Sequence, residues 1–142
     1  MFYLDTSFLV AAFSFEKRSV EARSWLDRTA PEELFISSWV ETEFSSALSL
    51  KVRTGQISVD ERSLVLPNWR LFVADTVAVI AVDVRDFDTA TQMVSHYQNG
   101  LRASDALHIA IAQGAGCTLV TLDKRMADAA IELGVPVAEV VK

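Results

Sequence analysis

Short apolar runs alternate with helix-forming segments along almost the whole chain, and this alternation restricts the possible folds more than any other feature. Each run is only a few residues long and is rich in large or β-branched apolar side chains, which favour buried strands. The runs cover residues 2–4, 34–37, 77–82, 118–122 and 137–141. Strands separated by helices form parallel sheets that helices cover on both faces. The sequence therefore predicts an α/β fold with a parallel sheet of about five strands, flanked by helices on both faces.

Apolar spacing and cap residues predict a helix in each of the intervening segments. The predicted helices cover residues 8–13, 19–28, 38–53, 58–75, 84–97, 101–113 and 124–133. Ser38 and Glu41 have the spacing of a capping box, so the third helix is expected to begin with Ser38 as its N-cap. Pro67 is expected to kink or divide the fourth helix, because proline lacks the amide hydrogen. The helix over 101–113 is apolar nearly all round and is expected to be buried.

Length and composition predict one globular domain over residues 1–142. Hydrophobic residues make up 51% of the chain and charged residues 23%, an ordinary globular mix. Cys117 has no second cysteine to pair with, which favours a reducing, cytoplasmic location. No apolar run reaches the length of about 18 residues that a membrane span needs. The apolar first residues lack the basic start and the cleavage site of a signal peptide.

The net charge of −6 argues, taken alone, against nonspecific binding of nucleic acid. Bound cations reverse the local field around acidic groups, however, so this argument loses its force if several of the acids are metal ligands. Overall charge therefore does not decide the partner.

Four carboxylates lie where a packed core or a tight turn would normally exclude an unpaired charge: Asp5, Glu43, Asp105 and Asp123. Asp5 and Asp123 end the first and fourth strands, on the side where α/β sheets bind ligands. Asp105 opens the most apolar helix. Glu43 flanks the apolar stripe of its helix, and it is preferred to Glu41, which is assigned to the capping box. Four such acids from separate elements indicate a site for a divalent cation.

Each of these residues also has an ordinary structural alternative. Asp5 and Asp123 stand where helix N-caps are expected, and Asp105 stands in a first helical turn, where a negative charge interacts favourably with the helix dipole. His108 lies three residues after Asp105, so it is placed to hydrogen-bond that carboxylate. The favoured interpretation of His108 is nevertheless a buried core residue with its hydrogen bonds satisfied.

Oxygen donors without histidine or cysteine favour a hard cation, Mg²⁺ or Mn²⁺. One or two such ions activate water for attack on phosphorus and stabilise the leaving oxygen. Metal-dependent phosphodiester hydrolysis is therefore the leading chemistry. Three basic residues adjoin the acids and are placed to meet a polyanion: Arg102, Lys124 and Arg125.

The segments around the four acids resemble the motifs of PIN-domain ribonucleases. These segments are 4–7 (LDTS), 43–48 (EFSSAL), 101–108 (LRASDALH) and 119–125 (LVTLDKR). Their order and spacing match over essentially the whole chain. The size and single-domain build resemble VapC, the toxin of bacterial and archaeal type II toxin–antitoxin pairs.

The resemblance implies a PIN fold and an endoribonuclease that depends on Mg²⁺ or Mn²⁺, with RNA such as transfer or ribosomal RNA as substrate. It implies a catalytic and metal-binding set made of Asp5, Glu43, Asp105 and Asp123. The hydroxyls of Thr6 and Thr121 match positions that support the acids in the family. A homodimer and a cognate VapB-like antitoxin are the implied protein partners.

Alternative functions remain open at this point. A haloacid-dehalogenase-type phosphatase needs a second aspartate two residues after the first, and Ser7 occupies that place. A receiver-like regulatory domain needs an acidic pair after the first strand, where this chain has one acid; Asp83 after the third strand does not complete the set. A catalytically silent PIN-fold scaffold is a further alternative, although the acidic set is intact.

Overall fold

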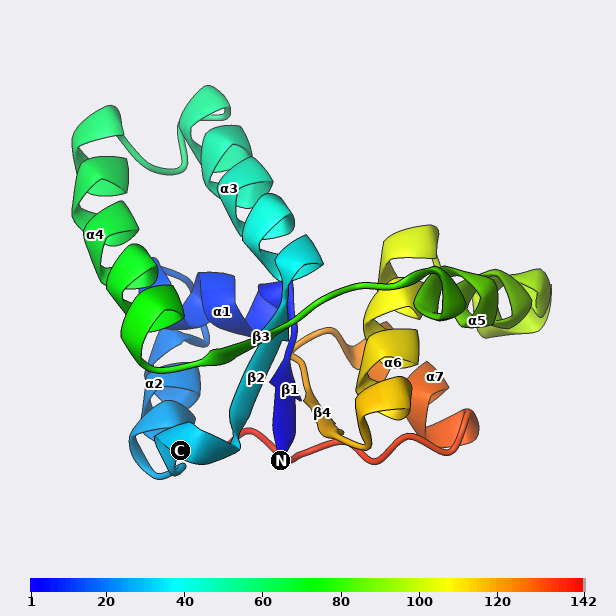
Figure 1. Ribbon diagram of the computed structural model, residues 1–142. Helices are drawn as coiled ribbons and strands as arrows, with labels where there is room; N and C mark the ends of the chain where they lie inside the picture. Colours follow the sequence, from blue (N-terminus) through cyan, green and yellow to red (C-terminus); the bar gives the residue numbers. More distant parts are fainter. Residues whose placement is uncertain (142) are drawn as a thin grey trace.

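The computed structural model describes residues 1–141, which form a parallel sheet with helices on both sides (Figure 1). The strands are β1 (Phe2–Leu4), β2 (Leu34–Ser37), β3 (Ala78–Ile80) and β4 (Thr118–Val120). The helices are α1 (Thr6–Phe13), α2 (Ser19–Asp27), α3 (Ser38–Arg53), α4 (Val59–Asp75), α5 (Val84–Ser95), α6 (Ala103–Ala115) and α7 (Lys124–Glu132). The strand order is β3-β2-β1-β4, and all three pairings are parallel. The predicted α/β class is confirmed.

The order of the strands explains why helices lie on both faces of the sheet. The chain steps from β1 to β2 to β3 in one direction and then crosses to β4, on the other side of β1. Crossovers between parallel strands are right-handed, so connections that run in opposite directions lie on opposite faces. Accordingly, α1 to α4 gather on one side of the sheet and α5 to α7 on the other (Figure 1).

Register brings the carboxyl ends of all four strands to the same edge of the sheet. Leu4 is paired with Val120, and the amide of Asp5 extends this pairing with a 3.0 Å hydrogen bond to the Val120 carbonyl. Ser37 at the end of β2 is paired with Ile80. The residues that follow these strands therefore emerge side by side.

The fifth predicted strand, 137–141, is reduced to a single bridge. Val137 pairs with Leu119 alone, and the adjoining hydrogen bonds join Leu119 to the carbonyl of Pro136 and the amide of Ala138. Pro136 has no amide hydrogen to donate to a longer ladder. The sheet thus has four strands within the described residues, with one further segment attached at its edge.

The predicted N-cap of α3 was wrong, and of the two effects expected of Pro67, a kink or a division, the division does not occur. The N-cap of α3 is Ser37, whose hydroxyl accepts from the amide of Val40, so the predicted capping box of Ser38 and Glu41 does not form. The helix therefore begins one residue earlier than an N-cap at Ser38 would require. Pro67 does not divide α4, which runs unbroken past it.

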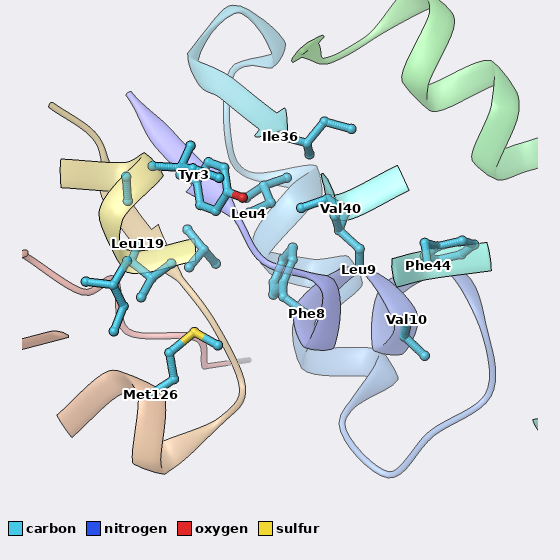
Figure 2. Close-up of a cluster of buried hydrophobic side chains, with 14 of the residues drawn as sticks. Tyr3, Leu4, Phe8, Leu9, Val10, Ile36, Val40, Phe44, Leu119 and Met126 are labelled. Carbon is cyan, nitrogen blue, oxygen red and sulfur yellow. The ribbon is translucent and has the colours of Figure 1, made fainter. Parts of the chain in front are cut away.

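The core lies where the two helical layers meet the sheet (Figure 2). Tyr3 and Leu4 of β1 are fully buried, and α6 is buried over residues 106–112, as predicted. On the other side, Phe44 of α3 stacks on Trp69 of α4, with ring centroids 4.0 Å apart and planes 16° apart. This stack joins the two long helices of that layer.

No helix within residues 1–141 combines the length and the apolar character needed to cross a membrane.

Truncation of the stacked aromatic tests this account of the core. Phe44→Ala is expected to lower the free energy of unfolding by about 3–5 kcal/mol, because it removes a fully buried ring and leaves a cavity. Leu64→Ala on α4 is the control; Leu64 is 69% exposed, so its change is expected to stay within about 0.5 kcal/mol. Urea unfolding monitored by circular dichroism measures both. Equal effects of the two variants would contradict the proposed packing.

Candidate active site

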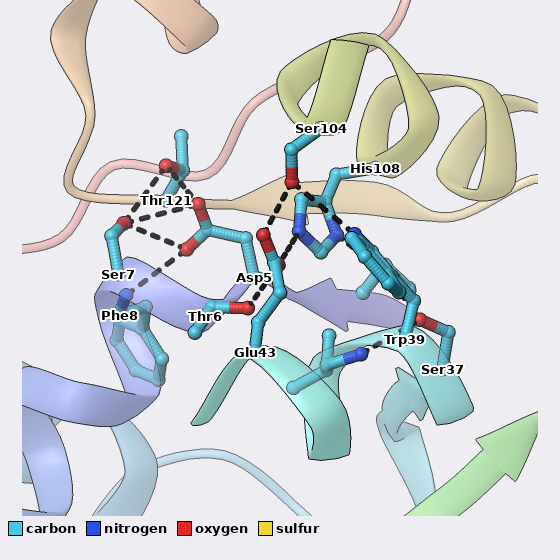
Figure 3. A network of polar contacts seen from close by, with 12 residues as sticks. Asp5, Thr6, Ser7, Phe8, Ser37, Trp39, Glu43, Ser104, His108 and Thr121 are labelled. Carbon is cyan, nitrogen blue, oxygen red and sulfur yellow. Dashed lines mark hydrogen bonds and ion pairs between the residues drawn. The ribbon is translucent and has the colours of Figure 1, made fainter. Parts of the chain in front are cut away.

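A pocket of about 180 Å³ lies at the carboxyl edge of the sheet, and all four predicted acids line it. The side chains come from the end of β1, from α3, from the start of α6 and from the segment after β4 (Figure 3). The full lining is Asp5, Thr6, Ser7, Glu43, Arg102, Ser104, Asp105, His108, Asp123 and Met126. The fold therefore brings together residues that are more than a hundred positions apart in sequence.

Asp5 follows β1 directly and is the N-cap of α1. Its carboxylate accepts hydrogen bonds from the amide of Phe8 at 3.0 Å, from the hydroxyl of Ser7 at 2.9 Å and from the hydroxyl of Thr121 at 2.7 Å (Figure 3). The helix cap and the predicted site residue are thus the same side chain. The structural and the functional interpretation of this aspartate do not exclude each other.

Burial makes the negative charge of Asp5 energetically unfavourable at this position. The residue is 1% exposed, and no lysine or arginine of the described chain forms an ion pair with it. Burial raises the pKa of Asp5, and the charge of His108 and the hydrogen bonds offset only part of that rise. A buried carboxylate without a cationic partner is a position where a bound cation brings a large electrostatic gain.

Glu43 accepts hydrogen bonds from three side chains. Its carboxylate accepts from Thr6 at 2.6 Å and also from Ser104 and His108 (Figure 3). Burial alone would raise the pKa of Glu43, but these hydrogen bonds and the charge of His108 outweigh it and hold the pKa below its usual range. Glu43 is therefore a well-anchored carboxylate.

Glu41, two residues earlier on the same helix, does not line the pocket. The capping argument that separated the two glutamates was wrong, since Glu41 makes no capping contact. The choice of Glu43 agrees with the structure for another reason. Helical spacing puts it beside the apolar stripe that turns toward the sheet.

Asp105 and Arg102 lie together at the start of α6. Asp105 is 7% exposed, and the Nε atom of Arg102 is 3.5 Å from one of its carboxylate oxygens. The Arg102 side chain is 75% exposed, so the guanidinium reaches solvent at the mouth of the pocket. It therefore brings a positive charge to an otherwise acidic rim.

Asp123 is the N-cap of α7 and accepts from the amide of Met126 at 3.1 Å. Thr121 links it to the first acid, because the Thr121 hydroxyl accepts from the amide of Asp123 at 3.0 Å and donates to Asp5. Together with the contact from Thr6 to Glu43, this means that each predicted supporting hydroxyl bonds to one of the acids.

Lys124 and Arg125 lie in the first turn of α7 but outside the pocket lining. Lys124 is paired with Asp128 at 3.2 Å on the exposed side of that helix. Their contact with RNA stays a prediction.

Two residues outside the predicted set of site residues complete the site. His108 is buried with both ring nitrogens bonded, as predicted, but it contacts Glu43 and Tyr3 and has no bond to Asp105. Ser104 bonds Glu43 and also accepts from the indole of Trp39 at 3.2 Å. Ser104 and His108 lie close to Asp105 on one helix, and this proximity in sequence was the signal that could have identified them as site residues.

The donor chemistry of the pocket fits a hard cation. Four carboxylates and several hydroxyls line it, and oxygen atoms are the ligands that Mg²⁺ and Mn²⁺ prefer. Within the described residues, no three acid, histidine or cysteine side chains are arranged to hold a metal ion as they stand. The carboxylates of Asp5 and Glu43 instead accept hydrogen bonds from hydroxyl, amide and imidazole donors.

A wider groove of about 590 Å³ adjoins the pocket, since Thr6, Ser7 and Asp123 line both. The groove lies along α1 and α3 and is also lined by three basic residues: Lys17, Arg18 and Lys51.

Known proteins resemble this chain over nearly its whole length. Ribonuclease VapC35 of Mycobacterium tuberculosis is 33% identical over 143 aligned residues, which cover 96% of this chain and 95% of that protein. Among solved structures, Mycobacterium tuberculosis VapC20, described as a toxin that cleaves the sarcin–ricin loop, has a TM-score of 0.72 at 19% identity, covering 91% of this chain and 95% of that chain. VapBC2 from Rickettsia felis, bound to a promoter DNA fragment, has a TM-score of 0.71 at 20% identity, covering 97% and 98%.

These structural likenesses establish the fold. The family model of the PIN domain matches residues 2–132, which include all four acids. This match and the identity to VapC35 agree with the motifs in the sequence. The chain therefore belongs to the PIN domain family.

Proposed function

We propose that this protein is an endoribonuclease that depends on Mg²⁺ or Mn²⁺ and serves as the toxin of a VapBC-type pair. The observation that carries the proposal is the convergence of four carboxylates from four elements on one pocket of a PIN-domain protein. The named activity of VapC35, a ribonuclease, supports RNA as the substrate.

The residues that would hold the cation are Asp5, Glu43, Asp105 and Asp123. When bound, the cation stabilises negative charge on the scissile phosphate and favours ionisation of the attacking water. The lowered pKa of Glu43 suits a ligand better than a proton acceptor, because the group stays ionised at neutral pH. Thr6 and Thr121 hold two of these carboxylates in place.

The RNA backbone is proposed to reach the acids along the groove beside α1 and α3. Lys17 is exposed there, whereas Arg18 and Lys51 are paired with Glu21 and Glu16 at 2.6 Å and 3.0 Å. Arg102 meets the phosphate from the other side of the pocket, and Lys124 and Arg125 lie further along α7. Lysine and arginine side chains bind phosphate groups through their charge and do not distinguish one RNA sequence from another.

The toxin role brings two protein partners, a VapB-like antitoxin and a second copy of the chain. Support comes from relatives whose names include both components, such as VapBC2 of Rickettsia felis and the VapBC complex of Salmonella typhimurium. Exposed apolar side chains on α4 and α5, among them Leu64, Leu71, Val84 and Phe87, offer surface for such contacts.

The purified protein is expected to cleave structured RNA with Mg²⁺ or Mn²⁺ and to stop when a chelator is added. Asp105→Asn and Glu43→Gln are each expected to lower kcat by at least about 100-fold, because even residues that only support a metal ligand contribute roughly 10- to 100-fold. Initial rates with end-labelled RNA, measured against metal concentration, give the result.

Glu41→Gln is the matched control, since it removes the same charge from the same helix outside the pocket. Its kcat is expected to stay within about twofold of the wild type. Unchanged cleavage by both Asp105→Asn and Glu43→Gln would overturn the site. A wild-type protein that binds RNA but leaves it intact with either cation would favour the silent scaffold.

Asp5→Asn is expected to stabilise the protein in chelator, because it removes a buried charge. The folded-state pKa of Asp5 lies above its ordinary value of 3.8, so the folded state binds this proton more tightly than the unfolded state. The aspartate's contribution to stability is therefore present below pH 3.8 and is lost as the pH rises through the folded-state pKa.

The difference in unfolding free energy between Asp5→Asn and the wild type should accordingly grow as the pH rises above 3.8 and level off once the pH exceeds the folded-state pKa. Urea unfolding in chelator at a series of pH values measures it. Added Mg²⁺ should then stabilise the wild type more than the variant. A difference that is constant with pH, or that shrinks as the pH rises, would show that burial does not penalise this carboxylate.

Expression in a bacterial host tests the toxin role. Induction of the wild type is expected to arrest growth, and Asp105→Asn at the same protein level is expected to leave growth unchanged. Coexpression of the small protein encoded beside this chain in its own genome should restore growth and copurify with it. If the protein cleaves RNA in vitro but does not arrest growth, the ribonuclease function would stand and the toxin role would be contradicted.

A further inference from the structure

We propose that His108 is a positioning residue that fixes the carboxylate of Glu43 through a hydrogen-bonded relay to Tyr3 and Ser37. The proposal rests on the proposed ribonuclease function, because it gives Glu43 a part in that reaction. It gives a functional role to a histidine that the sequence treated as an ordinary core residue.

His108 is 2% exposed and uses both ring nitrogens (Figure 3). Its Nε2 atom bonds a carboxylate oxygen of Glu43, and its Nδ1 atom lies 2.8 Å from the hydroxyl of Tyr3. The Tyr3 hydroxyl lies 2.8 Å from the hydroxyl of Ser37, and both of these residues are fully buried. The relay therefore crosses the sheet layer without reaching solvent.

The direction of the relay follows from what each group can donate. An ionised carboxylate only accepts, so Nε2 of His108 carries the hydrogen that bonds Glu43. In the proposed relay, the phenol of Tyr3, which lies 2.8 Å from Nδ1 of His108, donates to that nitrogen. Ser37 then donates to Tyr3 and accepts from the amide of Val40 at 3.3 Å. Every hydrogen bond in the relay points toward the carboxylate.

The relay begins and ends on the same helix. Ser37 caps the first turn of α3, and Glu43 lies in its next turn, so Tyr3 of β1 and His108 of α6 connect two points of one helix through two other elements. Thr6 and Ser104 also bond Glu43, but each is a hydroxyl that rotates and is only partly buried. The planar, buried imidazole is the donor that sets the orientation of the carboxylate.

Two substitutions of His108 separate positioning from general packing. The amide nitrogen of His108→Gln reaches the place of Nε2 and keeps a donor for Glu43, whereas His108→Asn reaches only the place of Nδ1. His108→Asn is expected to lower kcat about 10- to 100-fold with KM for RNA within about twofold, and His108→Gln is expected to recover most of kcat. Tyr3→Phe, which removes only the relay hydroxyl, should give a smaller loss of kcat.

Ser14→Ala is the matched control, because Ser14 is fully buried, its hydroxyl donates to the carbonyl of Val10, and it does not line the pocket. It is expected to lower stability and leave kcat unchanged. Folded His108→Asn protein with wild-type kcat would overturn the proposal, and so would equal loss of kcat in the Gln and Asn variants. Thermal unfolding of each variant establishes that the comparison is made on folded protein.

Nitrogen-15 NMR of the His108 ring, recorded in chelator, tests the relay without any catalysis. The Nε2–H tautomer is expected, with its resonance moving in Glu43→Ala and the Nδ1 resonance moving in Tyr3→Phe. An Nδ1–H tautomer, or a ring that does not respond to either change, would overturn the relay. If the wild type fails to cleave RNA with any cation, the proposed function fails, and the NMR result still decides whether His108 holds Glu43.

Discussion

The carboxylate of Asp5, buried where β1, α1 and β4 meet, is the constraint on which the rest of the site depends. It caps α1 through the amide of Phe8 and it joins β4 through the hydroxyl of Thr121. Both bonds are local consequences of a strand that ends in a helix N-cap. The same bonds leave the negative charge in the interior without a basic partner, and the surrounding acids add to that charge. The fold thus holds a carboxylate where burial opposes its negative charge, and a bound cation would offset that cost.

The parts of the site that lie at strand ends could be predicted from the sequence. Asp5 and Asp123 end apolar runs, and parallel strands bring their carboxyl ends to one edge by geometry alone. The cap positions of both residues are equally local signals. The convergence of Asp5 and Asp123 does not depend on the details of side-chain packing. The pattern of apolar runs and turn residues was therefore sufficient to predict that these two residues lie close together.

The contacts between helices could not be predicted in the same way. Glu43 and His108 are 65 positions apart, and their bond depends on how α3 and α6 approach across the edge of the sheet. The start of α3 was placed one residue late, because Ser37 and Ser38 are both acceptable caps by residue type. The edge segment at Val137 was overestimated for a related reason, since its apolar character says nothing about whether partners are available to extend the ladder.

The hydrogen-bond donors around Glu43 would compete with a cation for its carboxylate. Every buried side-chain nitrogen and oxygen in the described part of the chain has a hydrogen-bond partner, and Glu43 accepts from three donors at once, of which His108 is the buried one. A cation that draws this carboxylate toward itself leaves donors in need of new acceptors, at about 1–3 kcal/mol for each buried one that finds none. The hydrogen bonds that hold Glu43 in place would therefore lower the affinity of the pocket for the proposed cation.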